Sequence, residues 1–234
     1  MALQNNFIGI VCGLASEAQC IPSTIDATAI RIEVSGADAS RALHLSKKLI
    51  DMGATGLLSF GISGSLSPTA ETGTLLIANM IVLPTQESVT SSQDWVSRLQ
   101  DAAYASALPL QTVSMYGSNS LIGSPEEKAE LFRKTSAIAV DMESAGVACA
   151  ASVAGRPFAA LRAIADPAHR SIPASAAKVV RIDGGIRPLA ALGALVRKPA
   201  DLGTYIRLGQ DSQKGLASLR RGADELLPVL LGSL

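Results

Sequence analysis

The chain has 234 residues, of which 48% are hydrophobic and 17% are charged. This composition predicts one folded domain with a large core and excludes disordered, collagen-like and coiled-coil classes. Lysine and arginine number 20 together, as do aspartate and glutamate. The chain therefore lacks the excess positive charge that holds a nucleic acid backbone, and we expect no nucleic acid partner.

The cysteines and the N-terminal segment predict a cytoplasmic protein without a metal site. Cys12, Cys20 and Cys149 form no CxxC pair and lie in apolar runs, which is typical of buried thiols in a reducing compartment. The first apolar run is too short for a signal peptide or a membrane span. His44 and His169 have no cysteine or carboxylate at ligand spacing.

In the first half of the chain, short runs of β-branched and apolar residues predict strands at residues 7–12, 29–34, 57–60 and 74–83. Asp38 is placed to cap a helix that ends at Gly53. The glycines in Gly61-Ile62-Ser63-Gly64 predict a turn between the third and fourth strands. In such a turn, backbone N–H groups could converge on an anion, although a purely structural turn fits the same residues.

In the second half, helices are predicted at residues 91–107, from Ser124-Pro125 onward, and at 142–154, and strands at 110–115, 137–140 and 158–164. Strands that alternate with helices predict a mostly parallel sheet covered on both faces. Ligands bind such sheets at the carboxyl ends of the strands. We therefore expect the site in the loops after Cys12, Phe60, Val140 and Ile164.

The C-terminal part is rich in leucine and alanine and predicts helices at 186–196 and 202–230. We predict a main domain over residues 1–180 and a helical C-terminal extension over 181–234. Residues 178–221 include nine basic and three acidic residues, an excess of six positive charges. The basic residues are Lys178, Arg181, Arg187, Arg197, Lys198, Arg207, Lys214, Arg220 and Arg221, and the acidic residues are Asp183, Asp201 and Asp211. These charges are either solvated faces of packed helices or a surface for anionic lipid.

Two carboxylates flank Met142 where a predicted buried strand becomes a helix. A buried carboxylate needs hydrogen-bond donors or a positive charge. In a structural interpretation, Asp141 caps the helix and Glu143 lies in its first turn. In a functional interpretation, Glu143 reaches into the crevice and accepts hydrogen bonds from substrate hydroxyl groups. The residues alone leave both interpretations open.

The segment from Arg162 to Pro167 places an arginine inside a strand and an aspartate at its end. We expect the arginine to pair with a buried acid and predict Asp141 as that partner. Asp166 can act as a general acid if an apolar surround raises its pKa. The alternative role for Asp166 is a turn cap before Pro167.

Taken in order, four segments resemble the nucleoside phosphorylase/nucleosidase superfamily: residues 9–17 (GIVCGLASE), 60–68 (FGISGSLSP), 139–145 (AVDMESA) and 161–168 (LRAIADPA). Within it, the chain is most similar to the hopanoid-biosynthesis-associated phosphorylase group, through Asp166–Pro173 and the tail rich in arginine and leucine. The resemblance implies a single α/β domain with a phosphorylase-like, mixed but mostly parallel sheet flanked by helices. It also implies cleavage of the N-glycosidic bond of a purine nucleoside, here adenosylhopane, with release of adenine.

The resemblance further implies roles for individual residues. Glu143 binds the ribose hydroxyl groups, Met142 packs beneath the sugar, and Asp166 donates a proton to the purine. The remaining residues expected to line the substrate site are Gly61, Ile62, Ser63, Gly64 and Val140. Arg162 and Asp141 are expected to support the site, which would use phosphate or water as its nucleophile.

Three departures from the superfamily pattern concern that nucleophile. The acid that activates water in hydrolytic relatives aligns with Ala18, which leaves Glu17 as a substitute. Ser59 stands where phosphorolytic relatives carry an arginine, and Ile62 where they carry a serine. Inorganic phosphate as co-substrate and hydrolysis by water therefore both stay open, and we expect no other cofactor.

Two alternatives to adenosylhopane cleavage stay open as well. One is a phosphorylase or nucleosidase of soluble purine nucleosides such as adenosine, methylthioadenosine or adenosylhomocysteine. The other is an inactive protein that binds adenine nucleosides or acts as a scaffold. Superfamily sites often take residues from a neighbouring subunit, which implies a homo-oligomer. A lipid-linked substrate would bring the cytoplasmic protein into weak peripheral contact with the inner membrane surface.

Overall fold

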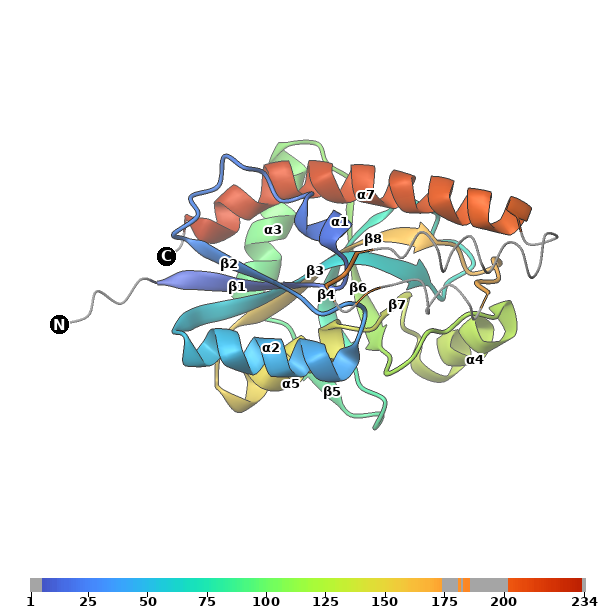
Figure 1. Ribbon diagram of the computed structural model, residues 1–234, viewed down its shortest axis with the longest axis horizontal. Coiled ribbons are helices and arrows are strands. Elements are labelled where there is room, and N and C mark those ends of the chain that lie inside the picture. The colour runs from blue at the N-terminus through green and yellow to red at the C-terminus, as the bar shows by residue number, and fades with distance from the viewer. Residues whose placement is uncertain (1–5, 174–180, 182, 186–201, 233–234) are drawn as a thin grey trace.

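A mixed sheet of eight strands forms the centre of the molecule (Figure 1). The structure is a computed structural model that describes residues 6–173, 181, 183–185 and 202–232. The strands are β1 (Phe7–Cys12), β2 (Ile30–Val34), β3 (Ala54–Ser65), β4 (Leu75–Val82), β5 (Ser88–Thr90), β6 (Leu110–Gly117), β7 (Ala139–Asp141) and β8 (Phe158–Asp166). Their order is β2-β1-β3-β7-β6-β4-β5, and β8 pairs with both β3 and β4. The pairings β3–β8–β4–β6–β7–β3 therefore close into a ring.

Helices cover both faces of this sheet (Figure 1). They are α1 (Ala15–Ala18), α2 (Ala39–Asp51), α3 (Gln93–Ala105), α4 (Pro125–Thr135), α5 (Ser144–Val153) and α7 (Leu202–Leu231). One buried cluster joins α2 and α5 to the sheet, and a second joins α3 and α7 to its other face. The predicted α/β class with a mixed, mostly parallel sheet between helices is confirmed.

Local signals explain where several helices begin and end. Asp38 caps α2 by accepting a hydrogen bond from Arg41 N at 2.8 Å, and Gly53 follows its end with a φ of 98°. Ser124 and Glu127 form a capping box at the start of α4, with Pro125 in its first turn.

The predicted turn at Gly61–Gly64 is wrong, because these residues continue β3. They pair in parallel with β8, where Gly61 lies opposite Arg162 and Gly64 opposite Asp166. Gly64 also pairs with Val140 of β7. Hydrogen bonding to two neighbouring strands outweighs the local preference of glycine for turns. The short elements α1 and β5 were not predicted.

The C-terminal helix α7 agrees with the helix predicted at 202–230 and packs against β8 and α3. The helix predicted at 186–196 and the domain boundary at residue 180 lie outside the described residues, as do Lys178, Arg187, Arg197 and Lys198. In the part of the chain that the structure describes, no helix is long and apolar enough to cross a membrane.

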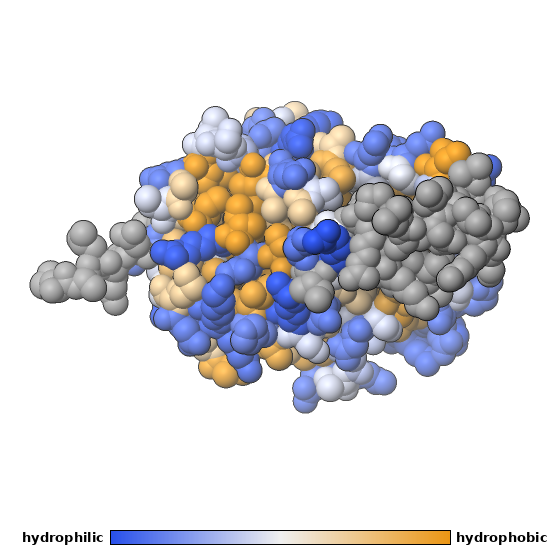
Figure 2. Space-filling model, viewed as in Figure 1, coloured by the Kyte–Doolittle hydropathy of each residue, from blue (hydrophilic) through white to orange (hydrophobic). Residues whose placement is uncertain are grey.

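Apolar side chains gather on the surface at one edge of the sheet. Figure 2 shows this patch over β1 and β2, between α7 and α2. Ile32 of the edge strand β2 is 38% exposed. Exposed apolar patches of this kind are suited to protein contacts, and the expected homo-oligomer stays a prediction.

Candidate active site

A cavity of about 280 Å³ opens where the loop after β1 meets the ends of β3, β7 and β8. Most of the predicted site residues line it: Glu17, Ile62, Ser63, Gly64, Val140, Asp141, Met142, Glu143 and Asp166. Gly61 and Arg162 lie behind this wall and contact Glu17 and Asp141, respectively. The fold therefore brings residues from four separate segments of the sequence to one place.

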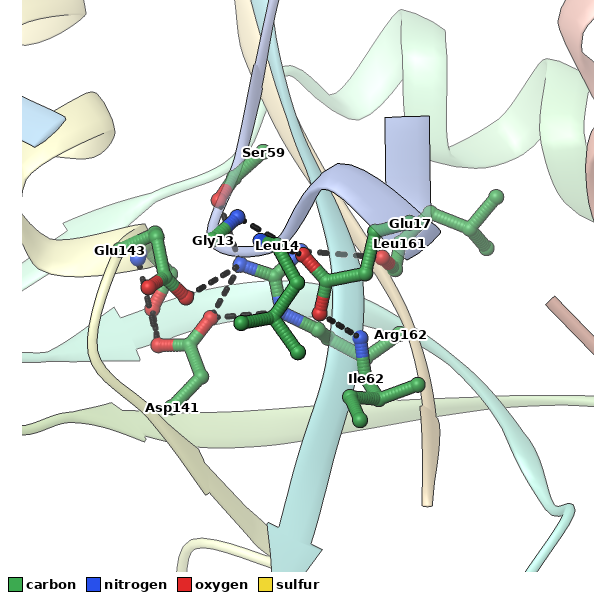
Figure 3. Close-up of polar contacts among 10 residues, drawn as sticks. Gly13, Leu14, Glu17, Ser59, Ile62, Asp141, Glu143, Leu161 and Arg162 are labelled. Carbon is green, nitrogen blue, oxygen red and sulfur yellow. Dashed lines mark hydrogen bonds and ion pairs between the residues drawn. The ribbon is translucent and has the colours of Figure 1, made fainter. Parts of the chain in front are cut away.

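Arg162 is the positive centre of the site and is completely buried. Its guanidinium group pairs with Asp141, as the sequence predicted, and Nε donates to Asp141 Oδ2 at 2.6 Å (Figure 3). Nη2 donates to Ser59 Oγ at 2.6 Å. Glu143 Oε2 lies 3.8 Å from Nη2. Ser59 thus serves as a partner for Arg162.

Asp141 and Glu143 have different surroundings. Asp141 Oδ1 accepts hydrogen bonds from Ser144 N, at 3.2 Å, and from Ser144 Oγ, so it anchors the start of α5 while Oδ2 pairs with Arg162. This matches the structural interpretation of Asp141. Glu143 lies farther from Arg162, at 3.8 Å, and lines the cavity. Its carboxyl group is therefore available to a ligand.

Glu17 accepts hydrogen bonds from three backbone N–H groups, one of which belongs to the Gly61–Gly64 segment. Its Oε2 accepts from Gly13 N at 2.7 Å and Leu14 N at 2.8 Å, and its Oε1 accepts from Ile62 N at 2.9 Å (Figure 3). Ala18, the residue that aligned with the acid of hydrolytic relatives, packs instead against the apolar cluster under α7. Of these two neighbouring residues, Glu17 is the one that lines the cavity.

Two glycines make room for these carboxylates. A Cβ at Gly13 would lie 2.6 Å from Glu143 Oε1, and a Cβ at Gly61 would lie 2.7 Å from the carboxyl carbon of Glu17. Real Cβ atoms do not approach other atoms this closely. A side chain at either position would therefore displace the carboxyl group of the glutamate beside it.

Three buried carboxylates share one guanidinium group, so their charges do not balance. Burial raises the pKa of Glu143 to about 8, with further increases from the neighbouring Asp141 and Glu17 and a decrease from Arg162. Burial also raises the pKa of Glu17, against the opposing effects of Arg162 and of the three backbone N–H groups. Because those N–H groups favour an ionised Glu17, we assign the proton at neutral pH to Glu143.

Asp166 also lines the cavity and is 7% exposed. Its Oδ2 pairs with Lys128, a buried residue of α4 that the sequence analysis missed. Its buried Oδ1 has no hydrogen-bond partner among the residues that the structure describes. Burial raises the pKa of Asp166, and Lys128 opposes that rise.

The rest of the cavity wall is mainly apolar. Leu14, Leu121, Ile122, Ile172 and Leu208 line it. Ser63 also lines this cavity, and its buried hydroxyl group has no partner within the described ranges. No cluster of histidine, cysteine or carboxylate side chains in these ranges could hold a metal ion. The arrangement can therefore enclose an apolar molecule whose polar groups meet Glu17, Glu143 and Asp166.

Comparison with solved structures finds close likeness in fold. *Helicobacter pylori* 5′-methylthioadenosine/S-adenosyl homocysteine nucleosidase, in a complex with a pyrrolidine compound, has a TM-score of 0.73 at 17% identity, over 95% of this chain and 98% of that one. *Helicobacter pylori* futalosine hydrolase has a TM-score of 0.69 at 19% identity, over 94% and 98%. *Campylobacter jejuni* 5′-methylthioadenosine/S-adenosyl homocysteine nucleosidase has a TM-score of 0.70 at 16% identity, over 97% and 99%. At these identities, the likeness establishes the fold.

The family itself follows from the sequence. The family model of the phosphorylase superfamily matches residues 29–183, which is more than half of the chain. A comparison with curated proteins finds no match. The chain belongs to the phosphorylase superfamily and is thus an enzyme of the nucleoside phosphorylase and nucleosidase class.

Proposed function

We propose that this enzyme cleaves the N-glycosidic bond of a purine nucleoside and releases the base. The observation that carries the proposal is that Asp166 lines one cavity together with Glu17 and Glu143. Asp166 has a raised pKa and one oxygen without a partner among the described residues, as a proton donor to a leaving base requires. The ionised Glu17 provides negative charge, which a positively charged sugar requires, and the carboxyl group of Glu143 provides acceptor oxygens beside it.

In the proposed mechanism, Asp166 donates the proton on Oδ1 to a ring nitrogen of the purine. The electrons of the glycosidic bond leave with the base, and positive charge develops on the sugar. Glu143 holds the ribose hydroxyl groups, and Met142 packs beneath the ring. Interactions that strengthen as this charge develops lower the barrier rather than only tightening substrate binding.

We propose water as the nucleophile, with Glu17 as the base that activates it. The support is electrostatic. The three backbone N–H groups suited to an anion already bind the Glu17 carboxylate, and the guanidinium group of Arg162 is occupied by Asp141 and Ser59. A phosphate ion would enter a region of like charge, whereas a water molecule would not. The alternative is phosphorolysis, and product analysis with and without inorganic phosphate distinguishes it from hydrolysis.

For the substrate, we propose adenosylhopane. The support is the motif resemblance to the hopanoid-associated group, together with the apolar side chains of Leu121, Ile122, Ile172 and Leu208 at the cavity. A nucleoside with an apolar group on its sugar would bury that group there. Methylthioadenosine, adenosylhomocysteine and adenosine are the soluble alternatives, and the solved relatives named for methylthioadenosine and futalosine extend this panel.

Because adenosylhopane is a lipid-linked substrate, the proposal also includes weak contact between the enzyme and a membrane surface. Each basic residue near an anionic surface contributes about 1 kcal/mol, screened by salt. Co-sedimentation with anionic vesicles at low salt, and its loss at high salt or with neutral vesicles, is the expected result. If the protein does not co-sediment with anionic vesicles at low salt, the basic residues form only a solvated surface.

The experiment that tests the reaction is product analysis with each nucleoside of the panel, with and without inorganic phosphate. We expect adenine and a free sugar hydroxyl group at C1, at a rate that phosphate does not change. A sugar 1-phosphate formed only with added phosphate would instead identify a phosphorylase. Binding of adenine nucleosides without release of base would identify an inactive binding protein.

A further inference from the structure

Helix α4 completely buries one side chain, and that side chain is charged. Lys128 is 0% exposed, whereas Leu131 and Phe132, one turn along the helix, are partly buried against Leu66 and Val140. Removing an ammonium group from water is unfavourable unless other groups replace the lost hydrogen bonds. A lysine at this position therefore needs a specific set of partners.

The ammonium group has that set. It donates to Asp166 Oδ2, to Arg170 O at 2.9 Å and to Pro167 O at 3.2 Å. An ammonium group has three N–H donors, so all of them are used. The two carbonyl groups belong to the loop that directly follows Asp166. Lys128 thus connects α4 to the end of β8. Of this pair, Asp166 is the residue that lines the cavity.

We propose that Lys128 is a positioning residue that makes Oδ1 the proton-donating oxygen of Asp166. This inference rests on the proposed function. Because Oδ2 accepts a hydrogen bond from the ammonium group, the proton of the neutral carboxyl group resides on Oδ1, the oxygen that has no partner among the described residues. When that proton passes to the purine, the carboxylate that forms is already paired with Lys128.

Lys128 also sets the strength of the acid. The charged groups that act on Asp166 come from three elements: Lys128 of α4, Arg170 of the loop after β8, and Asp211 of α7. Arg170 and Asp211 pair with each other at 3.0 Å, and their effects on the pKa of Asp166 oppose one another. Removal of the Lys128 charge leaves burial as the main influence, which makes Asp166 a weaker acid.

The test compares Lys128→Met with Lys134→Met. Lys134 lies on the same helix but is exposed and pairs with Glu130 at 2.6 Å. For each variant, kcat and KM for adenine release are measured from pH 5 to pH 10, and thermal unfolding is recorded. In Lys128→Met, we expect kcat to fall about tenfold or more, as part of the contribution of a general acid. We expect the pH above which kcat declines to move up by about one to three pH units, and KM to change little.

A double-variant cycle separates positioning from a merely structural role. If Lys128 acts through Asp166, Lys128→Met should cause no further loss of kcat in an Asp166→Asn background. If Lys128→Met does not fold, the same pH measurement is made on Lys128→Gln. This variant keeps a hydrogen-bond donor but removes the charge.

Two results would overturn the inference: no change in the pH above which kcat declines in the folded Lys128 variant, or an equal loss of kcat with and without the Asp166 carboxyl group. Near wild-type turnover of Asp166→Asn, or no release of base by the wild type, would instead overturn the proposed function. The two failures are therefore distinguishable.

Discussion

The carboxyl group of Glu143 lies against the Cα of Gly13, so closely that a Cβ at Gly13 would come within 2.6 Å of Oε1. The loop after β1 and the start of α5 thus meet through a glycine and a carboxylate. A residue larger than glycine at position 13 would therefore displace the carboxyl group of Glu143. This contact fixes the direction in which Glu143 faces the cavity.

The first prediction follows from that contact. Gly13→Ala should displace Glu143, destabilise the fold by about 1–3 kcal/mol through overpacking, and reduce turnover at least tenfold. Gly209→Ala is the matched control, because a Cβ there meets nothing within 4 Å and alanine favours a helix by up to about 1 kcal/mol. Urea unfolding and adenine release measure both effects. Wild-type turnover in Gly13→Ala would show that the position of Glu143 is not critical.

The second prediction concerns the ribose hydroxyl groups. Glu143→Gln keeps the shape of the side chain but replaces one acceptor oxygen with an NH2 group, which cannot accept a hydrogen bond from the second hydroxyl group of a pair. The parent enzyme should therefore react slowly with a 2′-deoxy substrate, and the variant should lose little further on that substrate. The comparison uses kcat/KM for both substrates with both proteins. Equal losses on the two substrates would assign Glu143 to another role.

The third prediction concerns Glu17. Glu17→Ala should reduce hydrolysis about a hundredfold or more, because it removes the general base, and should leave the donors Gly13 N, Leu14 N and Ile62 N without an acceptor. Added formate should then bind these donors and restore part of the rate, with no effect on the wild type. A variant that hydrolyses the nucleoside at the normal rate would exclude Glu17 as the base.

The fourth prediction is a pH dependence of stability. The pKa of Glu143 rises from 4.5 to about 8 on folding, so the folded state binds more protons than the unfolded state between these values. Its contribution to stability is therefore full below about pH 4.5 and is lost as the pH rises toward 8, by at most about 1.4 kcal/mol per pH unit. Glu143→Gln should show a shallower decline in urea unfolding from pH 5 to pH 8. Parallel curves for the two proteins would contradict a raised pKa at Glu143.

Much of the fold could be predicted because its signals are local. The short apolar runs of β1 and β8 and the caps of α2 and α4 are each encoded within a few residues. The pair of Arg162 and Asp141 followed from the cost of burying a charge, which applies whatever the fold.

The errors and omissions depend on contacts between distant segments. Gly61–Gly64 form part of a strand because β7 and β8 pair with them. Glu17 binds Ile62 N across 45 positions of the sequence. Lys128 lies on the same helix face as Leu131 and Phe132, a pattern that indicates burial, but its partner Asp166 is 38 positions away. Only the folded chain shows that partner.

The central claim, that Asp166 protonates the leaving base, is tested most directly by adenine release from the wild type and Asp166→Asn. Asp183→Asn serves as control, because Asp183 pairs with Arg181 at an exposed site. We predict that the wild type and the control release adenine at the same rate, and that Asp166→Asn is slower by about a hundredfold or more with its fold intact. Turnover by Asp166→Asn close to that of the wild type would contradict the account.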